Sequence, residues 1–146
     1  MDLLLDRYGI DAISCTSIGY NMNDVYQIHT NSQDYCLRVH NPCDLVFGSG
    51  FFSKGSFEFE MLFLYDLYHY FLTKGIVLQK PISDCSGSFV VELPNNSFAT
   101  MVTWVEGNSI DLDEATEDDY YRIGELLALL HKFGSKNATN YKISRQ

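Results

Sequence analysis

The chain has 146 residues, of which 46% are hydrophobic and 14% aromatic, so it can bury the core of an ordinary domain and is not of disordered composition. Its formal net charge of −9 would repel a phosphate backbone, which argues against nucleic acid as a partner. No window approaches the roughly 18 apolar residues of a membrane span, and the first residues lack the long apolar run of a signal peptide, so we expect no membrane association.

The first part of the chain predicts a short helix and then three strands. Residues 3–8 are amphipathic and are followed by Gly9, a pattern typical of a helix with a glycine C-cap. Three β-like segments follow, and the polar residues 31–34 suit a hairpin turn between the last two. Short connections predict an antiparallel meander. The strands are expected at 12–17, 25–30 and 35–40.

A loop and a long helix come next. Residues 41–55 include Pro42, three glycines and three phenylalanines, and they predict a loop. Residues 56–74 carry apolar side chains at helical spacing, and Gly75 is expected to end this helix. The predicted apolar face consists of Phe59, Leu62, Phe63, Tyr70 and Phe71.

The following residues return to strand character. Segments 89–93 and 98–105 predict two more strands, and Pro94 and the two asparagines after it favour a turn between them. Residues 106–109 predict a loop that could act as a hinge. Together with the first three strands, this order predicts an α+β fold with a five-stranded antiparallel sheet and one helix inserted after the third strand.

The chain closes with a helix and a polar tail. Thr116, with Asp119 three residues later, is close to a capping box, and Gly134 is expected to end the helix at about Phe133. Residues 135–146 predict a frayed tail. The wide apolar stripe must be buried against something, so we expect self-association through residues 115–133, or docking with a separately encoded second half. The stripe comprises Ile123, Leu126, Leu127, Leu129 and Leu130.

Charge and cysteine placement add two expectations. The acidic run that starts at Asp111 favours a solvated helix start, with a docking site for a cationic substrate as the alternative. The four cysteines show neither a Cys-x-x-Cys pair nor zinc spacing. Because Cys15, Cys36 and Cys85 adjoin strand-like segments, they indicate reduced core thiols in a cytoplasmic protein.

Five local patterns occur in a fixed order along these elements. They are Gly19-Tyr20-Asn21-Met22-Asn23, Leu37-Arg38-Val39, Glu58-Phe59-Glu60 with the leucines after it, residues 101–107 (Met-Val-Thr-Trp-Val-Glu-Gly), and residues 124–131 (Gly-Glu-Leu-Leu-Ala-Leu-Leu-His). In this order they resemble the N-terminal lobe of the kinase-like family that includes aminoglycoside phosphotransferases, choline kinases and type II homoserine kinases. The resemblance covers residues 8–134. It implies a kinase-like N-terminal lobe at 1–105, a hinge at 106–114, and the first helix of a second lobe with its tail at 115–146.

The resemblance implies a phosphate-binding role for two of these segments. The turn holding Gly19, Asn21 and Asn23 would cover the nucleotide phosphates, although an ordinary hairpin turn has the same appearance. Arg38 would hold the phosphates from the third strand, the alternative being a surface arginine. Glu60 would pair with Arg38 and orient it. Glu58 is the rival for this role, and both glutamates could instead be solvated.

The 101–107 segment resembles the hinge that holds adenine in this family. The Thr103 carbonyl and the Val105 N–H would bind the base, and Met101 would sit at the back of its pocket. An edge strand with a buried Trp104 is the alternative. His131, in the last helix, is expected to serve packing only.

The resemblance also shows what the sequence lacks. Members of the family use a His-x-Asp-x-x-x-x-Asn segment and a later Asp for proton acceptance and Mg²⁺, and no histidine of this chain is followed at the second position by Asp. We therefore assign no catalytic and no metal-binding residues, and we expect the chain to be truncated before the catalytic loop. ATP or GTP is the implied ligand, and a small-molecule acceptor would need the second lobe. The alternative is a non-catalytic binding or regulatory lobe.

Overall fold

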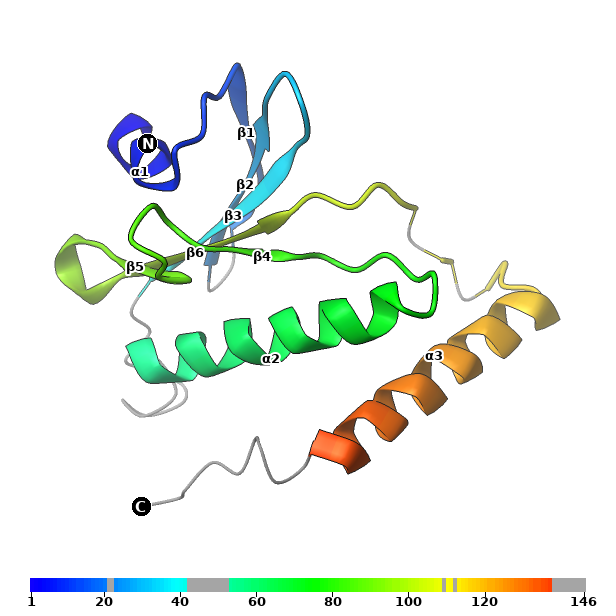
Figure 1. Ribbon diagram of the computed structural model, residues 1–146. Coiled ribbons are helices and arrows are strands. Elements are labelled where there is room, and N and C mark those ends of the chain that lie inside the picture. Colours follow the sequence, from blue (N-terminus) through cyan, green and yellow to red (C-terminus); the bar gives the residue numbers. More distant parts are fainter. Residues whose placement is uncertain (21–22, 42–52, 109, 112, 138–146) are drawn as a thin grey trace. The chain divides into compact units, whose positions relative to one another are not determined.

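The computed structural model describes residues 1–20, 23–41, 53–108, 110–111 and 113–137. The backbone divides into two units, Met1–Val105 and Glu106–Gln146. Figure 1 shows the elements in chain order. They are α1 (Asp2–Tyr8), β1 (Ser14–Tyr20), β2 (Asn23–His29), β3 (Tyr35–His40), α2 (Lys54–Leu72), β4 (Pro81–Ile82), β5 (Val90–Glu92), the 3₁₀ turn η1 (Pro94–Asn96), β6 (Phe98–Thr103) and α3 (Glu117–Asn137).

One antiparallel sheet organises the first unit. Its strand order is β1-β2-β3-β6-β4, and β5 also pairs with β6. The predicted α+β layout is confirmed, including the meander and the helix inserted after β3. β3 has the predicted bounds, whereas β1 starts two residues later than expected and β6 ends at Thr103. The two-residue β4 was not predicted.

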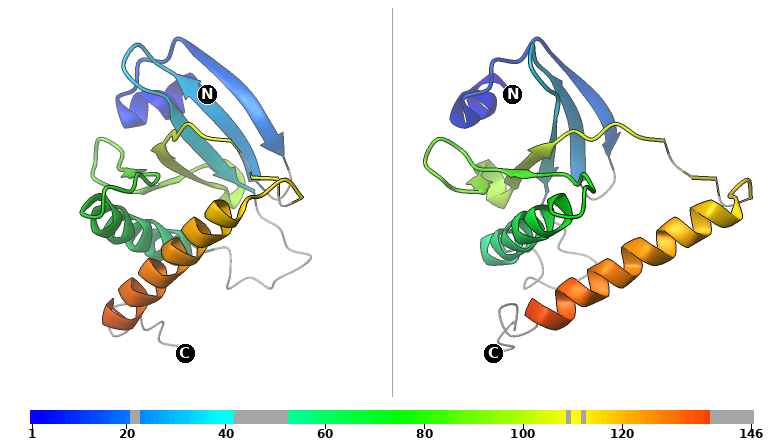
Figure 2. Two further views of the ribbon diagram at one scale, coloured as in Figure 1. Left: turned by 90° about the vertical axis from the view of Figure 1, so that its right-hand side faces the viewer. Right: turned by 45° about the vertical axis from the view of Figure 1, so that its right-hand side comes forward.

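Helix α1 packs on one face of the sheet and helix α2 packs on the other. Figures 1 and 2 show them on either side of β4, β5 and β6. Strand side chains alternate between faces, so Leu37 and Met101 enter the core beneath α1, and Cys36 and Val102 enter the core beneath α2. The α1 core comprises Leu4, Leu5, Tyr8, Ile28, Leu37, Val91, Ala99 and Met101. The α2 core comprises Cys36, Phe57, Met61, Val90 and Val102.

The short helix α1 ends as its sequence predicts. Gly9 takes a left-handed conformation, with φ 65°, and its N–H donates a hydrogen bond to a backbone carbonyl of the last turn. A residue with a Cβ would be strained there, which explains why glycine ends this helix. α1 is fixed to the rest of the unit by an ion pair of 3.3 Å between Arg7 and Asp84.

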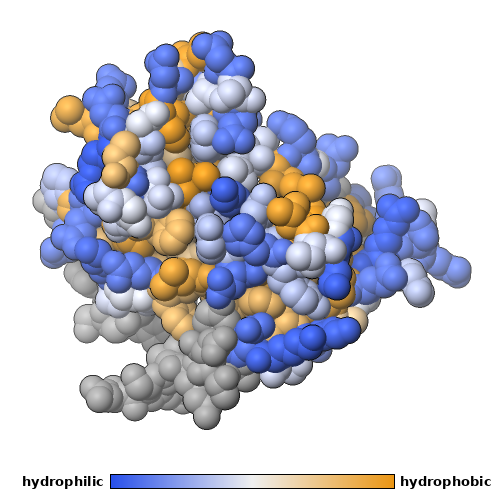
Figure 3. All heavy atoms as spheres, in the orientation of Figure 1, coloured by the Kyte–Doolittle hydropathy of each residue, from blue (hydrophilic) through white to orange (hydrophobic). Residues whose placement is uncertain are grey.

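Helix α2 begins with a capping box formed by Ser53 and Ser56. Of the predicted apolar face, only Phe71 belongs to the buried side, and Leu62 is 52% exposed. The prediction was wrong because this helix is apolar on nearly every side, so periodicity cannot select the face that packing selects. Figure 3 shows apolar and hydrophilic residues interleaved where α2 runs. The buried residues are Phe57, Met61, Leu67 and Phe71.

Helix α3, in the second unit, starts at the predicted cap. The Asp119 carboxylate accepts hydrogen bonds from the Thr116 N–H and hydroxyl, and the Thr116 hydroxyl accepts from the Asp119 N–H. The predicted end at Gly134 was wrong, because Gly134 remains helical and α3 continues to Asn137. A mid-helix glycine costs about 1 kcal/mol relative to alanine, which the helix tolerates.

Cys36 is buried as expected, but Cys15 and Cys85 are exposed, because one lies on the edge strand and the other in a surface loop. Cys43 and most of the predicted 41–55 loop lie outside the described residues. Within the part of the chain that the structure describes, no helix combines the length and apolar character needed to cross a membrane.

Candidate functional site

Arg38 lies in the middle of the sheet, on the face that α2 covers. Its cross-strand neighbours are Val25 on β2 and Thr100 on β6. The side chain is partly buried, and its Nη2 donates to the Oε1 of Gln79 at 3.5 Å, which is a long hydrogen bond. Gln79 was not among the predicted residues, because it precedes a strand too short to be recognised.

The expected partner of Arg38 is placed differently. Glu60 is exposed, and no ion pair among the described residues joins it to Arg38. Glu58, its rival, lies 3.8 Å from Lys54 on the helix surface. Moving both members of an Arg–Glu pair out of water has a large desolvation cost, whereas the neutral amide of Gln79 satisfies part of Arg38 without a second buried charge. Glu60 stands one turn before Leu64, a residue that packs against the α2 core.

His40 is a buried polar residue on the same face as Arg38, and it was not predicted. Its Nδ1 lies 3.1 Å from Oδ1 of Asn23, and its Nε2 lies 2.9 Å from the hydroxyl of Thr100. The imidazole stacks on Phe57 of α2, with ring centroids 4.1 Å apart. Burial, and then the nearby Arg38 guanidinium, lower the pKa of His40 to about 4. His40 is therefore neutral at physiological pH.

The predicted phosphate turn joins β1 to β2. Gly19 is in β1 opposite Val25, next to a register shift that begins after Ser17. A Cβ on Gly19 would meet nothing within 4 Å, so the backbone is open to a ligand on that side. Asn23 opens β2, and its side-chain carbonyl is held by His40. Asn21 lies outside the described residues.

The predicted hinge leaves the sheet at the end of β6. Thr103 makes two hydrogen bonds with Lys80. Its backbone N–H donates to the Lys80 carbonyl, and its hydroxyl accepts from the Lys80 backbone N–H, both at 2.9 Å. The backbone N–H of Trp104 donates to the backbone carbonyl of Asp34 at 2.9 Å. In the described residues, no backbone carbonyl accepts from the Val105 N–H.

Met101 does not lie on the Arg38 face. It is fully buried in the α1 core, and period-two alternation instead places Val102 on the α2 face. The structure therefore brings Arg38, Asn23 and His40 together on one face and places Met101 on the other.

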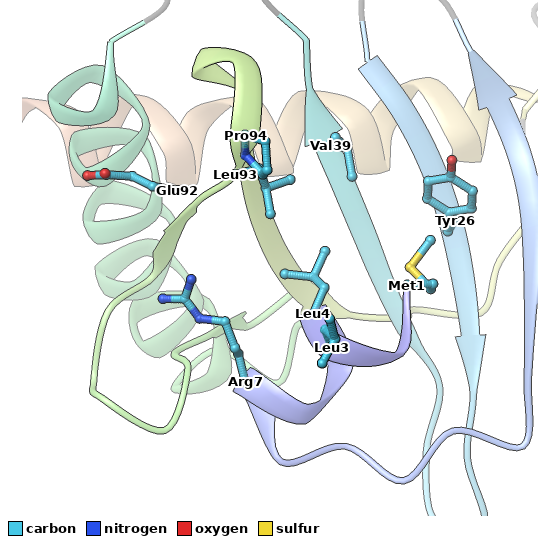
Figure 4. A pocket seen from close by; sticks show the side chains of 9 residues that line it. All are labelled: Met1, Leu3, Leu4, Arg7, Tyr26, Val39, Glu92, Leu93 and Pro94. Carbon is cyan, nitrogen blue, oxygen red and sulfur yellow. The ribbon is translucent and has the colours of Figure 1, made fainter.

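The pocket drawn in Figure 4 is on the α1 side of the sheet and has a volume of about 430 Å³. Val39 and Tyr26, which line it, point away from the α2 face. Its charged residues, Arg7 and Glu92, already have partners in Asp84 and Lys54. This pocket is therefore separate from the Arg38 face.

Comparison with known proteins identifies the fold. No family model and no curated protein sequence matches the chain. Among solved structures, spectinomycin phosphotransferase APH(9)-Ia, in complex with ADP and spectinomycin, is similar with a TM-score of 0.60 and 15% identity over 90% of this chain and 36% of that one. The microcompartment-associated aminopropanol kinase gives a TM-score of 0.59 and 21% identity over 89% of this chain and 38% of that one.

A third structure, amicoumacin kinase hAmiN in complex with AMP-PNP, Ca²⁺ and Ami, is similar with a TM-score of 0.54 and 16% identity over 77% of this chain and 33% of that one. The chain thus spans about a third of the length of the solved structures it matches. The expected kinase-like N-terminal lobe is confirmed as the fold of this chain.

Proposed function

We propose that this chain is the nucleotide-binding portion of a small-molecule phosphotransferase, with ATP or GTP as its ligand. The observation that carries the proposal is the position of Arg38 on the central strand β3, on the face that α2 covers. Arg38 is close to Asn23, the first residue of β2, which forms the root of the β1–β2 turn. Two of the structures that share the fold were solved with ADP or AMP-PNP, which supports a nucleotide as the ligand.

The groups on this face suit the two ends of a nucleotide. The Arg38 guanidinium carries several donors, and within the described residues it makes one long hydrogen bond, to the neutral amide of Gln79, so it could turn to a phosphate at little cost. The backbone around Gly19 is open enough for a close approach of phosphate. At the hinge, the Val105 N–H could donate to the base, and the Thr103 carbonyl could accept from it.

A metal does not fit the described residues in the same way. No group of three His, Cys, Asp or Glu side chains within them is arranged to hold an ion. The sequence also lacks the His-x-Asp-x-x-x-x-Asn segment that would accept the proton of an acceptor hydroxyl. We therefore assign nucleotide binding to this chain and no step of phosphoryl transfer.

Nucleotide binding is tested by thermal unfolding with and without ATP and by titration calorimetry. ATP at 100 times its dissociation constant should stabilise the fold by about 2.7 kcal/mol, which raises the melting temperature by several degrees. Arg38→Ala should weaken binding by roughly tenfold or more, because it removes a charge-assisted contact to phosphate.

The matched control is Arg122→Ala, which removes an exposed arginine of α3 that forms an ion pair with Asp118. Binding should be unchanged in this variant. If ATP fails to shift the melting temperature of the wild type, or both variants bind equally well, the proposal is wrong. The chain alone should show no ATP turnover in a coupled assay, and turnover that Arg38→Ala abolishes would contradict the assignment of binding without transfer.

A second candidate is a non-catalytic lobe that acts through a protein partner. The observation in its favour is the exposure of α3 leucines, with Leu126 at 41%, Leu127 at 51% and Leu130 at 36%. Under this candidate, ATP would leave the melting temperature unchanged, and a partner protein would raise it.

A further inference from the structure

His40 connects three elements on the Arg38 face. It ends β3, and its ring nitrogens reach Asn23 at the start of β2 and Thr100 in β6. The ring is also stacked on Phe57 in the first turns of α2, at an interplanar angle of 27°. Only 5% of the residue is exposed. An imidazole with two hydrogen bonds and a stacking partner is held in one orientation.

The hydrogen-bond chemistry assigns a tautomer to this ring. Oδ1 of Asn23 can only accept, so Nδ1 of His40 must carry the proton. Nε2 is then unprotonated and accepts from the Thr100 hydroxyl. Thr100 and Phe57 therefore fix the ring, and the ring in turn holds the Asn23 side chain.

Asn23 stands at the root of the turn that is expected to approach the phosphates. It is also the cross-strand partner of His40, two residues along β3 from Arg38. The imidazole thus adds a side-chain link at the turn root to the backbone pairing that already joins β2 to β3. A protonated His40 would place a second positive charge beside Arg38, and the neutral ring avoids this repulsion.

We propose that His40 is the positioning residue of the nucleotide site: it fixes Asn23, and with it the root of the β1–β2 turn, beside Arg38. This inference rests on the proposed nucleotide-binding function. His40 itself touches no ligand in this scheme, because its ring is enclosed by Asn23, Thr100 and Phe57.

The first experiment separates positioning from packing. His40→Phe keeps an aromatic ring on Phe57 but cannot donate to Asn23, so the affinity for ATP should fall roughly tenfold while the variant stays folded at the assay temperature. His40→Asn restores an N–H donor near the Nδ1 position but removes the ring. It should bind ATP more tightly than His40→Phe and yet melt at a lower temperature.

A purely structural role predicts that affinity follows stability, which is the opposite order. Asn23→Ala should weaken ATP binding in the wild type and have no further effect in His40→Phe, because both changes break the same link. His29→Phe is the matched control, since His29 is a partly exposed strand histidine that pairs with Asp34. Equal ATP affinities for His40→Phe and His29→Phe, or additive effects with Asn23→Ala, would overturn the proposal.

The second experiment needs no nucleotide, so it remains decisive if the wild type does not bind ATP. Long-range ¹H–¹⁵N correlation spectra should show His40 in the Nδ1–H tautomer. In His40→Phe, amide hydrogen exchange at Gly19 and Asn23 should accelerate roughly tenfold, while exchange at Met101 in the opposite core is unchanged. An Nε2–H tautomer, or exchange that rises equally at all three amides, would overturn the link itself.

Discussion

Asp84 shows how one buried side chain can join two distant segments. One carboxylate oxygen accepts from the N–H groups of Ser86 and Ser88, both at 2.9 Å, and from the Ser86 hydroxyl at 2.6 Å. The other oxygen lies 3.3 Å from Arg7 of α1. Burial would raise the pKa of this carboxyl, but the hydrogen bonds from the serines and from Arg7 outweigh it and hold the pKa below its ordinary value.

Asp84→Ala should therefore lower the free energy of unfolding by about 2–4 kcal/mol, because several donors lose their acceptor inside the fold. The measurement is urea unfolding at pH 7. Asp11→Ala is the control, since Asp11 is exposed and should change the free energy by less than about 0.5 kcal/mol. Similar losses in the two variants would contradict the structural role of Asp84.

Because His40 is buried and neutral, the stability of the fold should depend on pH. Its pKa is about 4 in the folded protein and near 6.5 in the unfolded chain, so the unfolded state binds the proton first as the pH falls. The stabilisation is complete above pH 6.5, declines between pH 6.5 and pH 4, and levels off below. The total loss is roughly 3 kcal/mol at most. Unfolding midpoints in urea at pH 7.5 and pH 4.5 measure it.

Among the described residues, Arg38 is the charged group whose field lowers the pKa of His40 further, and the ring contacts the neutral side chains of Asn23, Thr100 and Phe57. His40→Phe should remove this part of the pH dependence and leave the part caused by acidic groups such as Asp84. If His40→Phe and the wild type lose the same stability between pH 7.5 and pH 4.5, the buried neutral histidine is not the cause.

The candidate site was predictable only in part for reasons visible in single residues. Arg38 was singled out because a lone arginine between apolar strand residues is conspicuous, and its role toward a phosphate stays a prediction. His40 escaped notice, since a histidine at a strand end gives no sign of burial until β2, β6 and α2 surround it. Glu60 was expected to pair with Arg38, yet sequence cannot weigh the desolvation cost of that pair against a neutral acceptor such as Gln79.

At the level of elements, α2 sets the limit of periodicity arguments. Its buried side follows Phe57, Met61 and Phe71, while Leu62 stands in solvent although it is as apolar as Met61. The existence and approximate bounds of this helix were predictable from its composition. The face it presents to the sheet was not, because side-chain packing against β5 and β6, rather than spacing, selects it.

Adjacent alanine substitutions test this face directly. Met61→Ala should lower the free energy of unfolding by about 2–4 kcal/mol, because Met61 is 1% exposed and its removal leaves a cavity. Leu62→Ala, at 52% exposure, should cost less than about 1 kcal/mol. Chemical denaturation of both variants measures the difference. A larger loss of unfolding free energy for Leu62→Ala than for Met61→Ala would support the buried face predicted from sequence and contradict the observed one.

The other elements divide in the same way between local and tertiary causes. The α1 C-cap at Gly9 and the α3 cap at Thr116 are local devices, and both were predicted correctly. β4 has two residues and begins with Pro81, which has no N–H to donate, so only its pairing with β6 reveals it. The end of α3 was misplaced because a glycine that remains helical looks in sequence like one that ends a helix.

At the scale of the whole molecule, each of the two units has its own character. The first has a sheet with a core on either face. The second contains α3, whose leucines are largely exposed although they form a broad apolar stripe. Monomeric soluble proteins rarely expose large apolar patches, and a patch of this kind usually marks an interaction surface. Self-association through residues 115–133 therefore remains our prediction.

Sedimentation velocity over a range of concentrations tests this prediction. The wild type should show a concentration-dependent dimer, and Leu127→Glu should shift it to monomer, because a carboxylate cannot enter an apolar interface without a partner. Leu3→Glu is the control, since Leu3 is 83% exposed on α1 and lies outside α3. A wild type that is monomeric at all concentrations would contradict self-association.

Trp104 has an optical consequence. It is the only tryptophan of the chain, it packs against the α2 core, and its indole N–H is buried with no acceptor among the described residues. Its surroundings are apolar, so the native emission should lie at short wavelengths and shift to the red when the first unit unfolds. Because Trp104 directly follows β6, the protein has a built-in fluorophore where the backbone leaves the sheet. Its intrinsic fluorescence should report the unfolding of the first unit and, under the proposed function, nucleotide binding on the Arg38 face, without any attached dye.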